Sequence, residues 1–255
     1  MDSIAAFYGS DSSSSPSDSS DEEAAAPLAL EDDADASDAD TTSGRKRKRE
    51  GEESPAWIRA FAHVEGNWPS HVHVIIGAGD AELRELCGRV VSRAQQELGT
   101  RLALVPMDSS ELGGVHLSLS RPFTLRYEQI TPFVLELRAA LKWRRRFVLS
   151  LAGATVLVND ERTRSFLALR VADGEREVLA TLKCVDACMK HFALPVYYED
   201  PIPHVSIASC LGASLPEQLP PNQVRTLVGD EAPWTAAVTA VHVAIGNKQF
   251  RIPLV

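Results

Sequence analysis

Two histidines in this sequence of 255 residues are each followed two positions later by a serine. The motifs are His116-Leu117-Ser118 and His204-Val205-Ser206, and both are flanked by apolar residues. Side chains alternate between the faces of a strand, so we expect each His and Ser to point together while the residue between them enters the core. Two imidazoles can supply a neutral base and a protonated acid near pH 7. Counting alone leaves a second interpretation open, in which two half-buried strands simply turn their histidines to solvent.

The elements around each motif must position it. The two motifs are 88 residues apart, and each follows a predicted helix. Apolar residues at helical spacing predict three helices, over residues 83–94, 133–141 and 178–189. Alternating apolar residues predict strands over residues 72–76, 102–105, 115–119, 147–151, 155–158, 166–171, 205–208, 238–245 and 250–254. A polar turn between residues 155–159 and 165–171 predicts a hairpin, so the sheet is at least partly antiparallel. The order of elements favours an α+β protein made of two half-domains.

The charge is distributed unevenly along the chain. Residues 1–55 carry 15 acidic and 5 basic side chains, and residues 56–255 carry 20 and 21. The net charge of −9 therefore belongs to the first 55 residues, which are rich in Ser, Asp and Ala. Such a composition buries too little apolar area to fold, so we expect a disordered acidic tail at 1–55 and one domain at 56–255.

Near its end the tail contains five consecutive basic residues, Arg45 to Arg49. A compact basic run on a flexible arm is typical of a sequence read by a nuclear import receptor, so we expect the protein in the nucleus. The alternatives are a solvated charge run or a nonspecific contact with RNA. We expect no signal peptide and no membrane span, because no basic-then-apolar start and no apolar run of roughly 20 residues occurs. Four cysteines without a CxxC pair argue against a disulfide scaffold and a zinc ribbon.

The two motifs resemble the signature of the two-histidine (2H) phosphoesterase superfamily, a pair of His-x-Ser/Thr strands facing each other across a pseudo-twofold cleft. The wider context resembles the U6 small nuclear RNA phosphodiesterase family, on residues 114–122, on Tyr197-Tyr198-Glu199-Asp200-Pro201 with residues 204–208, and on residues 245–250. The resemblance covers about residues 57–255. It implies a bilobal α+β fold with two antiparallel sheets and outer helices. It also implies a monomeric, nuclear 3′-to-5′ RNA exonuclease that trims the oligouridine end of U6 small nuclear RNA for splicing.

A metal-independent mechanism follows from the residue types. One histidine takes the proton of the neighbouring 2′-hydroxyl, and the other protonates the departing 5′-oxygen. We assign His204 as the base and His116 as the acid, and we expect Ser118 and Ser206 to donate hydrogen bonds to the non-bridging phosphate oxygens. The RNA end would carry a 2′,3′-cyclic phosphate or, after ring opening, a 3′-phosphate. No cofactor is expected.

Three further features could contact RNA. Tyr198 precedes His204 by six residues and could stack on a terminal base, or it could simply pack; Tyr127 is a weaker candidate. The basic run from Lys142 to Arg146 and Arg121 could hold phosphates. The alternative for the run, favoured for Arg144 and Arg145, is that its cations complement a helix C-terminus.

Two rival functions use the same residues differently. The first is a 2′,5′-oligoadenylate or cyclic nucleotide phosphodiesterase of the same superfamily. The second is a nuclear RNA-binding module without catalysis. Other patterns favour structural roles: His71 and His73 are at most half of a metal site, and Cys184, Cys188 and His191 share one face of a helix. A Gly-x-Gly at residues 77–79 is too short to indicate a nucleotide site.

Overall fold

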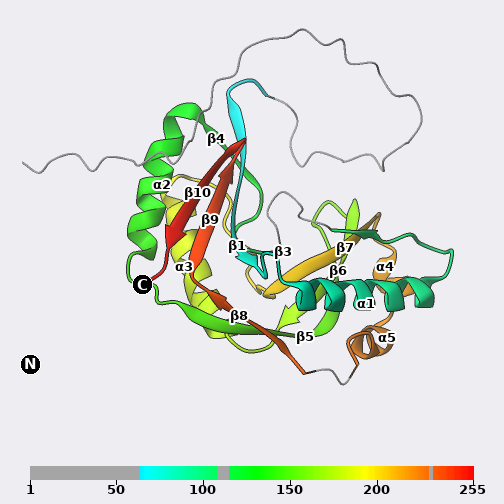
Figure 1. Ribbon diagram of the computed structural model, residues 1–255. Coiled ribbons are helices and arrows are strands. Elements are labelled where there is room, and N and C mark those ends of the chain that lie inside the picture. Colours follow the sequence, from blue (N-terminus) through cyan, green and yellow to red (C-terminus); the bar gives the residue numbers. More distant parts are fainter. Residues whose placement is uncertain (1–63, 108–114, 230–231) are drawn as a thin grey trace, which may run out of the picture. The chain divides into compact units, whose positions relative to one another are not determined.

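The computed structural model describes residues 64–107, 115–229 and 232–255 (Figure 1). The chain divides into two units, Met1–Pro55 and Ala56–Val255. The predicted acidic tail and its basic run at Arg45 to Arg49 lie outside the described residues, so both stay predictions. No helix among the described residues is both long and apolar enough to cross a membrane.

The described elements are ten strands and five helices, with several strands consecutive in the chain. In chain order they are β1 (Asn67–Ile76), α1 (Ala81–Leu98), β2 (Val105–Pro106), β3 (Val115–Ser118), β4 (Phe123–Arg126), α2 (Tyr127–Leu141), β5 (Phe147–Val158), β6 (Arg164–Val171), α3 (Glu175–His191), β7 (His204–Leu211), α4 (Leu215–Gln218), α5 (Pro221–Thr226), β8 (Trp234–Val238), β9 (Ala240–Ile245) and β10 (Lys248–Pro253). This confirms the predicted α+β class.

The strands form one sheet in the order β10-β9-β1-β3-β7-β6-β5-β8, with β4 paired to β1 and β2 to β7. Every pairing between the described strands is antiparallel. The order falls into two halves of four strands each, which meet at β3 and β7. The two sheets expected from the sequence are thus hydrogen-bonded to each other, through the pair Leu117 and Val205.

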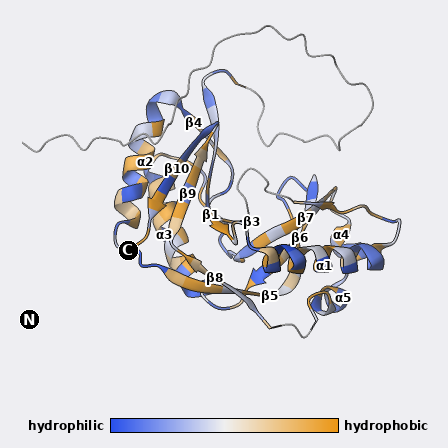
Figure 2. Ribbon diagram, viewed as in Figure 1, coloured by the Kyte–Doolittle hydropathy of each residue, from blue (hydrophilic) through white to orange (hydrophobic). Residues whose placement is uncertain are grey.

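The helices cover the sheet from both halves of the chain (Figure 1). Helices α2 and α3 pack against each other, and α2 also contacts β4 and β10. Helix α1 follows β1 in sequence but contacts β7 of the other half, where α4 and α5 lie on β5. Hydrophobic and hydrophilic residues both occur along α1 and α2 (Figure 2), as expected for helices with one buried face. Helix α1 therefore links the two halves, because it follows a strand of one half and packs on a strand of the other.

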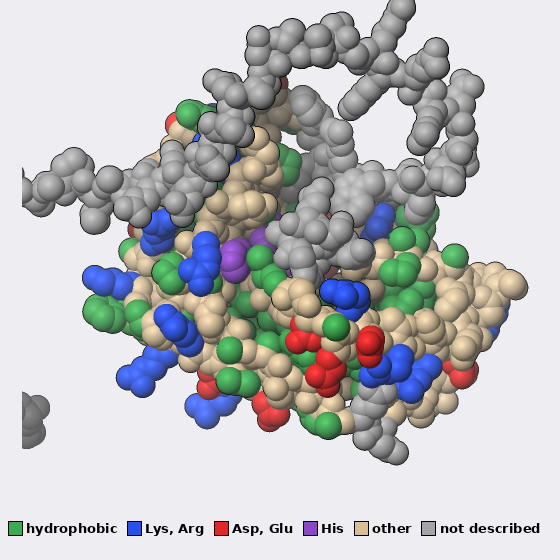
Figure 3. Space-filling view, viewed as in Figure 1, with side chains coloured by type: hydrophobic (Ala, Val, Ile, Leu, Met, Phe, Trp, Pro, Cys, Tyr) green, Lys and Arg blue, Asp and Glu red, His purple; other side chains and the backbone are tan. Residues whose placement is uncertain are grey.

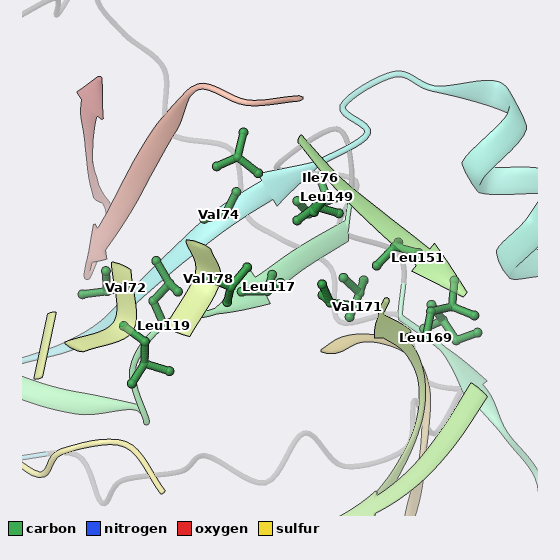
Figure 4. Close-up of a cluster of buried hydrophobic side chains, with 14 of the residues drawn as sticks. Val72, Val74, Ile76, Leu117, Leu119, Leu149, Leu151, Leu169, Val171 and Val178 are labelled. Carbon is green, nitrogen blue, oxygen red and sulfur yellow. The ribbon is translucent and has the colours of Figure 1, made fainter. Parts of the chain in front are cut away.

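A continuous hydrophobic core joins the two halves. Figure 4 shows part of it, with Val72 and Val74 of β1, Leu117 of β3, and Leu169 and Val171 of β6. These side chains are all at most 5% exposed. Each is buried because it points to the face opposite the histidines or lies under a helix. The position of β3 on β7 is therefore fixed by packing as well as by hydrogen bonds.

The structure extends some predicted elements and joins others. The two strands expected at residues 147–151 and 155–158 form one strand, β5, whose pairing with β6 shifts register between Leu151 and Ala154. Gly153 has φ of +74° there, a conformation that glycine adopts without strain. The hairpin of β5 and β6 is confirmed. Strand β4 was not predicted, because Phe123–Arg126 is short and runs directly into α2.

Four histidines crowd together on β1, β3 and β9. The ring of His73 stacks on His71 (centroids 5.2 Å apart) and on His242 (5.9 Å), and meets the His116 ring edge-on at 5.7 Å. His73 is 1% exposed, and neither of its ring nitrogens has a hydrogen-bond partner among the described residues. Burial, together with the smaller effect of charge on His116, lowers the pKa of His71 to about 3 and that of His73 to about 4. These two rings are therefore neutral in the folded protein at physiological pH.

This burial predicts that acid destabilises the fold before the carboxylates titrate. An unfolded histidine has a pKa near 6.5, so between that pH and about 3–4 the unfolded state binds more protons than the folded state. The contribution of these two histidines to the free energy of unfolding is fully present above pH about 7 and is lost as the pH falls. Between pH about 7.5 and about 5.5, we expect each of the two histidines to reduce the free energy of unfolding by about 1.4 kcal/mol. Urea titrations at the two pH values measure this loss.

The matched variants are His73→Phe, which keeps an aromatic ring but cannot titrate, and His191→Gln, which removes a histidine whose side chain is 66% exposed. The first should flatten the pH dependence, and the second should leave it as in the unmodified protein. Equal pH slopes for the unmodified protein and His73→Phe would show that His73 contributes nothing to the acid sensitivity.

Candidate functional site

The two His-x-Ser motifs lie side by side at the centre of the sheet. Leu117 of β3 is directly opposite Val205 of β7, and both side chains are buried, at 1% and 0% exposure. In an antiparallel pair this register puts His116 opposite Ser206 and Ser118 opposite His204, all four on the other face. Diagonal neighbours on such a pair lie about 7–8 Å apart, which is the expected separation of the two histidines.

The ends of the two strands are held by backbone contacts. At the end of β3, the N–H of Leu119 donates to the carbonyl of Val72 (2.8 Å), and the N–H of Val72 donates to Oγ of the buried Ser120 (2.9 Å). At the start of β7, the N–H of Val171 donates to the carbonyl of Pro203 (3.1 Å). Because both strands are anchored next to the motifs, the four polar side chains have little freedom to separate.

The ring of His204 is oriented by the backbone. Its Nδ1 lies 2.6 Å from the carbonyl oxygen of Ile202. A carbonyl only accepts, so Nδ1 carries the hydrogen, and in the neutral ring Nε2 keeps its lone pair. Burial lowers the pKa of His204, and the carbonyl of Ile202 opposes that effect by stabilising the charged ring.

His116 is enclosed by other histidines. Its ring lies edge-on to those of His71 and His73, with centroids 5.3 and 5.7 Å away. Burial lowers the pKa of His116, and charge on His204 lowers it further. The two histidines therefore sense each other electrostatically, and protonation of one disfavours protonation of the other. A pair of this kind holds one proton more readily than two.

Ser118 has a partner that the sequence did not reveal. Nε2 of His71 lies 3.1 Å from Oγ of Ser118. The structure thus places His71 next to the motif, and His73 and His242 behind it, whereas the sequence had offered His71 and His73 only as half of a metal site. Within the described residues, no group of three or more His, Cys, Asp or Glu is arranged to hold a metal ion.

Tyr198 lies in the segment that leads into β7 and is 44% exposed. The guanidinium of Arg121 lies 5.0 Å from its ring centroid, and Arg121 also forms an ion pair with Asp160. Burial and the charge of Asp160 raise the pKa of the Tyr198 hydroxyl. Arg121 follows Ser118 by three residues, so this pair stands at the end of β3 and holds the tyrosine by a cation–π contact.

The remaining candidates lie apart from the motifs. Tyr127 begins α2 and packs against Trp68, with ring centroids 6.3 Å apart. Cys188 is buried at 1% exposure and Cys184 is partly buried, while the side chain of His191 is 66% exposed. That distribution is typical of a packed helix face with a surface histidine.

Two arginines, one opposite a motif histidine and one beside the histidine cluster, were missed from the sequence. Arg170 of β6 is opposite His204, and Arg251 of β10 is opposite His242. Both side chains are exposed. The alternation Val241-His242-Val243 marked a polar position on a strand, but only the pairing of strands shows which other residues share its face.

Comparison with known proteins identifies the family. Residues 29–253 match the family model HVSL, described as an uncharacterised conserved protein. U6 snRNA phosphodiesterase 1 of Drosophila melanogaster is 33% identical over 201 residues, which cover 77% of this chain and 74% of that protein. The Mus musculus protein of the same name is 32% identical, over 77% and 73% of the two chains, and the Danio rerio protein is 32% identical, over 80% and 73%.

The fold also matches a solved structure. Kluyveromyces marxianus Usb1 superimposes with a TM-score of 0.52 at 16% identity, over 74% of this chain and 98% of that one. At this identity the match supports the fold, including the arrangement of a large antiparallel sheet with helices outside. Together with the sequence matches over most of the chain, it shows that the chain belongs to the U6 snRNA phosphodiesterase family.

Proposed function

We propose that this chain is a 3′-to-5′ RNA exonuclease that trims the oligouridine end of U6 small nuclear RNA, leaving a 2′,3′-cyclic phosphate or a 3′-phosphate. The observation that carries the proposal is the register of β3 on β7, which puts two histidines and two serines on one face. Relatives at 32–33% identity are named U6 snRNA phosphodiesterase 1, which supports a phosphodiesterase and this RNA. A structure of Kluyveromyces marxianus Usb1 contains uridine monophosphate, which supports a uridine end.

In the proposed reaction the 2′-oxygen attacks the adjacent phosphorus, so that a P–O2′ bond forms and the P–O5′ bond breaks. His204 takes the proton from the 2′-hydroxyl at Nε2, and His116 gives a proton to the departing 5′-oxygen. Ser118 and Ser206 donate hydrogen bonds to the non-bridging oxygens as their charge grows. The mutual repulsion of the two charged rings favours the singly protonated pair that this mechanism requires.

Two features bear on the order of the roles, and they favour opposite assignments. The Nδ1 contact with Ile202 leaves the neutral His204 with a lone pair on Nε2, as a base needs. The same carbonyl stabilises the charged form of His204, and that charge lowers the pKa of His116. A bound phosphodiester is negative and favours protonation of whichever ring lies beside it. We keep His204 as the base. In the complex, the position of the bound phosphodiester determines which of the two rings carries the proton.

His71 has a proposed role in positioning Ser118. Burial keeps the pKa of His71 well below neutrality, so its ring is neutral and has one N–H. When that hydrogen is on Nε2, the ring donates to Oγ of Ser118, and the serine hydrogen is free to point at a phosphate oxygen. A protonated His71 would add a positive charge to a crowded site, and its burial prevents this.

We also propose a nuclear location, with Arg45 to Arg49 bound by an import receptor. The support is the composition of that run and the nuclear RNA named in the relatives' names. On this proposal the protein acts as a monomer in the maturation of a spliceosomal RNA.

The first prediction concerns the two histidines. His116→Ala and His204→Ala should each lower kcat for oligouridine by about 10²–10⁴-fold, because each removes one proton transfer. The assay is run in EDTA with a labelled oligouridine, and thermal unfolding checks that each variant is folded. A substrate with sulfur in place of the departing 5′-oxygen needs no acid, so it should restore His116→Ala but not His204→Ala. Restoration of His204→Ala instead would reverse the two roles. Unchanged turnover in both variants would reject the site.

The second prediction concerns the nucleophile. An oligouridine with 2′-deoxyribose on the 5′ side of the cleaved phosphate should resist cutting, because no internal hydroxyl is present, while a deoxy sugar farther upstream should not matter. Mass analysis of the shortened end identifies the cyclic phosphate or 3′-phosphate. Efficient cutting of the deoxy substrate would rule out the mechanism, and faster cutting of 2′,5′-linked oligoadenylate would favour the other superfamily activity. RNA binding without any turnover would favour the non-catalytic module.

The third prediction concerns His71. His71→Phe keeps a ring but removes the donor to Ser118, and it should lower kcat/KM by about 3- to 10-fold, the value of one hydrogen bond. His71→Gln places a donor in a similar position and should recover most of the loss. In a Ser118→Ala background, His71→Phe should cost nothing further. Additive losses in the double variant would show that His71 acts by some route other than Ser118.

A further inference from the structure

A basic surface with an exposed aromatic ring lies where α2 leads into β5. We name it the α2–β5 patch, and it consists of Lys142, Trp143, Arg144, Arg145, Arg146 and Arg176. It borders an open cavity of about 770 Å³ whose lining contains four arginines and one glutamate, Glu177, a net formal charge of +3. The lining includes no histidine, so this cavity is distinct from the catalytic face.

The basic residues from Lys142 to Arg146 lie beyond the last residue of helix α2. Helix α2 ends at Leu141, and the chain from Arg144 to Arg146 then runs beside Val255, with the Val255 N–H donating to the Arg144 carbonyl (2.9 Å) and the Arg146 N–H donating to the Val255 carbonyl (2.8 Å). The guanidinium of Arg146 donates to the carbonyl of Leu254. Among the described residues, no ion pair is seen for Arg144, Arg145 or Arg176. The sequence favoured complementation of a helix C-terminus for Arg144 and Arg145, and that interpretation stays open, because the Arg144 N–H donates to the carbonyl of Leu141, the last residue of α2 (2.9 Å).

The aromatic part of the patch is unusually open. Trp143 is 77% exposed, and Lys142 lies over its ring, with Nζ 5.1 Å from the centroid. Val148, which also lines the cavity, is 61% exposed. A large indole surface left in water beside unpaired guanidinium groups is the combination by which proteins bind single-stranded nucleic acid, with bases stacked on the ring and phosphates on the cations.

The patch is connected to the catalytic face by β10. Arg251 of β10 is opposite His242, which stacks on His73 of the histidine cluster. From Arg251 the chain runs to Val255, which bonds to the patch, a path of about 13 Å at the rise of a strand. Figure 3 shows Lys and Arg side chains on the same side of the molecule as the histidines, toward the edge where β10 ends. An RNA that leaves the histidines along this edge passes Arg251 before it reaches the patch.

We propose that the α2–β5 patch is a second RNA-binding site, which holds the single-stranded segment upstream of the cleaved end, with Trp143 stacked on a base and Arg144, Arg145 and Arg176 on phosphates. This inference rests on the proposed function, because it assigns the partner as the same oligouridine substrate. With this second site, the enzyme binds a long RNA more tightly than a dinucleotide. The chemistry of the reaction does not depend on the patch.

The test compares a long oligouridine with a uridine dinucleotide. Trp143→Ala should raise KM for the long substrate by about 5- to 150-fold, the effect of one stacked base, with kcat unchanged. The double variant Arg144→Glu/Arg145→Glu should do the same and make KM less sensitive to salt, because fewer counterions are released. Both variants should cut the dinucleotide at the normal rate.

Two variants serve as matched controls. Arg225→Glu reverses an exposed charge on α5, and Leu135→Ala removes a side chain that is 50% exposed on the same helix α2. Neither should change KM for either substrate. Equal losses on both substrate lengths, or no loss on either, would overturn the second site.

Direct binding separates this inference from the proposed function. If the unmodified protein cuts neither substrate, the exonuclease proposal fails. Fluorescence anisotropy with the long oligouridine then still tests the patch, since the two patch variants should weaken binding and the two controls should not. If those variants bind the oligouridine normally but lose affinity for a poly-glutamate peptide, the occupant is an acidic protein segment and the RNA assignment is wrong.

Discussion

The pairing of β3 with β7 is the contact on which the rest of the molecule depends. It joins the two halves of the sheet, and it does so at Leu117 and Val205, the apolar residues between the histidine and serine of each motif. Burial of these two side chains in the common core turns the four polar ones to the opposite face. The same contact thus stabilises the fold and sets the register of the candidate site, so a shift of one residue in either strand would remove both.

The candidate site lies against a cluster of histidines that burial keeps neutral. A carboxylate beside His116 would raise the pKa of its ring, whereas His71 and His73, kept neutral by burial, leave its protonation state responsive to substrate and to His204. The arrangement is costly, because His73 has two ring nitrogens without partners in the described part of the chain. The buried neutral histidines therefore lower the free energy of unfolding at low pH.

Charge is organised differently in the site and around it. The proposed reacting groups are neutral or singly charged, while Arg170 is opposite His204, Arg251 is opposite His242, and the α2–β5 patch carries further positive charge. In the proposed function, attraction of RNA and local proton transfer are thus assigned to different residues.

The sequence by itself determined the α+β class, three of the helices, most strands, the β5–β6 hairpin and the two His-x-Ser motifs, because apolar periodicity and strand alternation are local properties of the chain. Tertiary structure decided the continuous strand β5, the short strand β4, the contact of His71 with Ser118, the position of Arg170 opposite His204, and the positions of His242 and Arg251 beside the histidine cluster. A strand's own residues show which side chains share a face, but not which strand lies beside it, because that choice depends on the packing of distant residues. For this reason His71 looked like half of a metal site in the sequence and became the neighbour of Ser118 only when β1 was paired with β3.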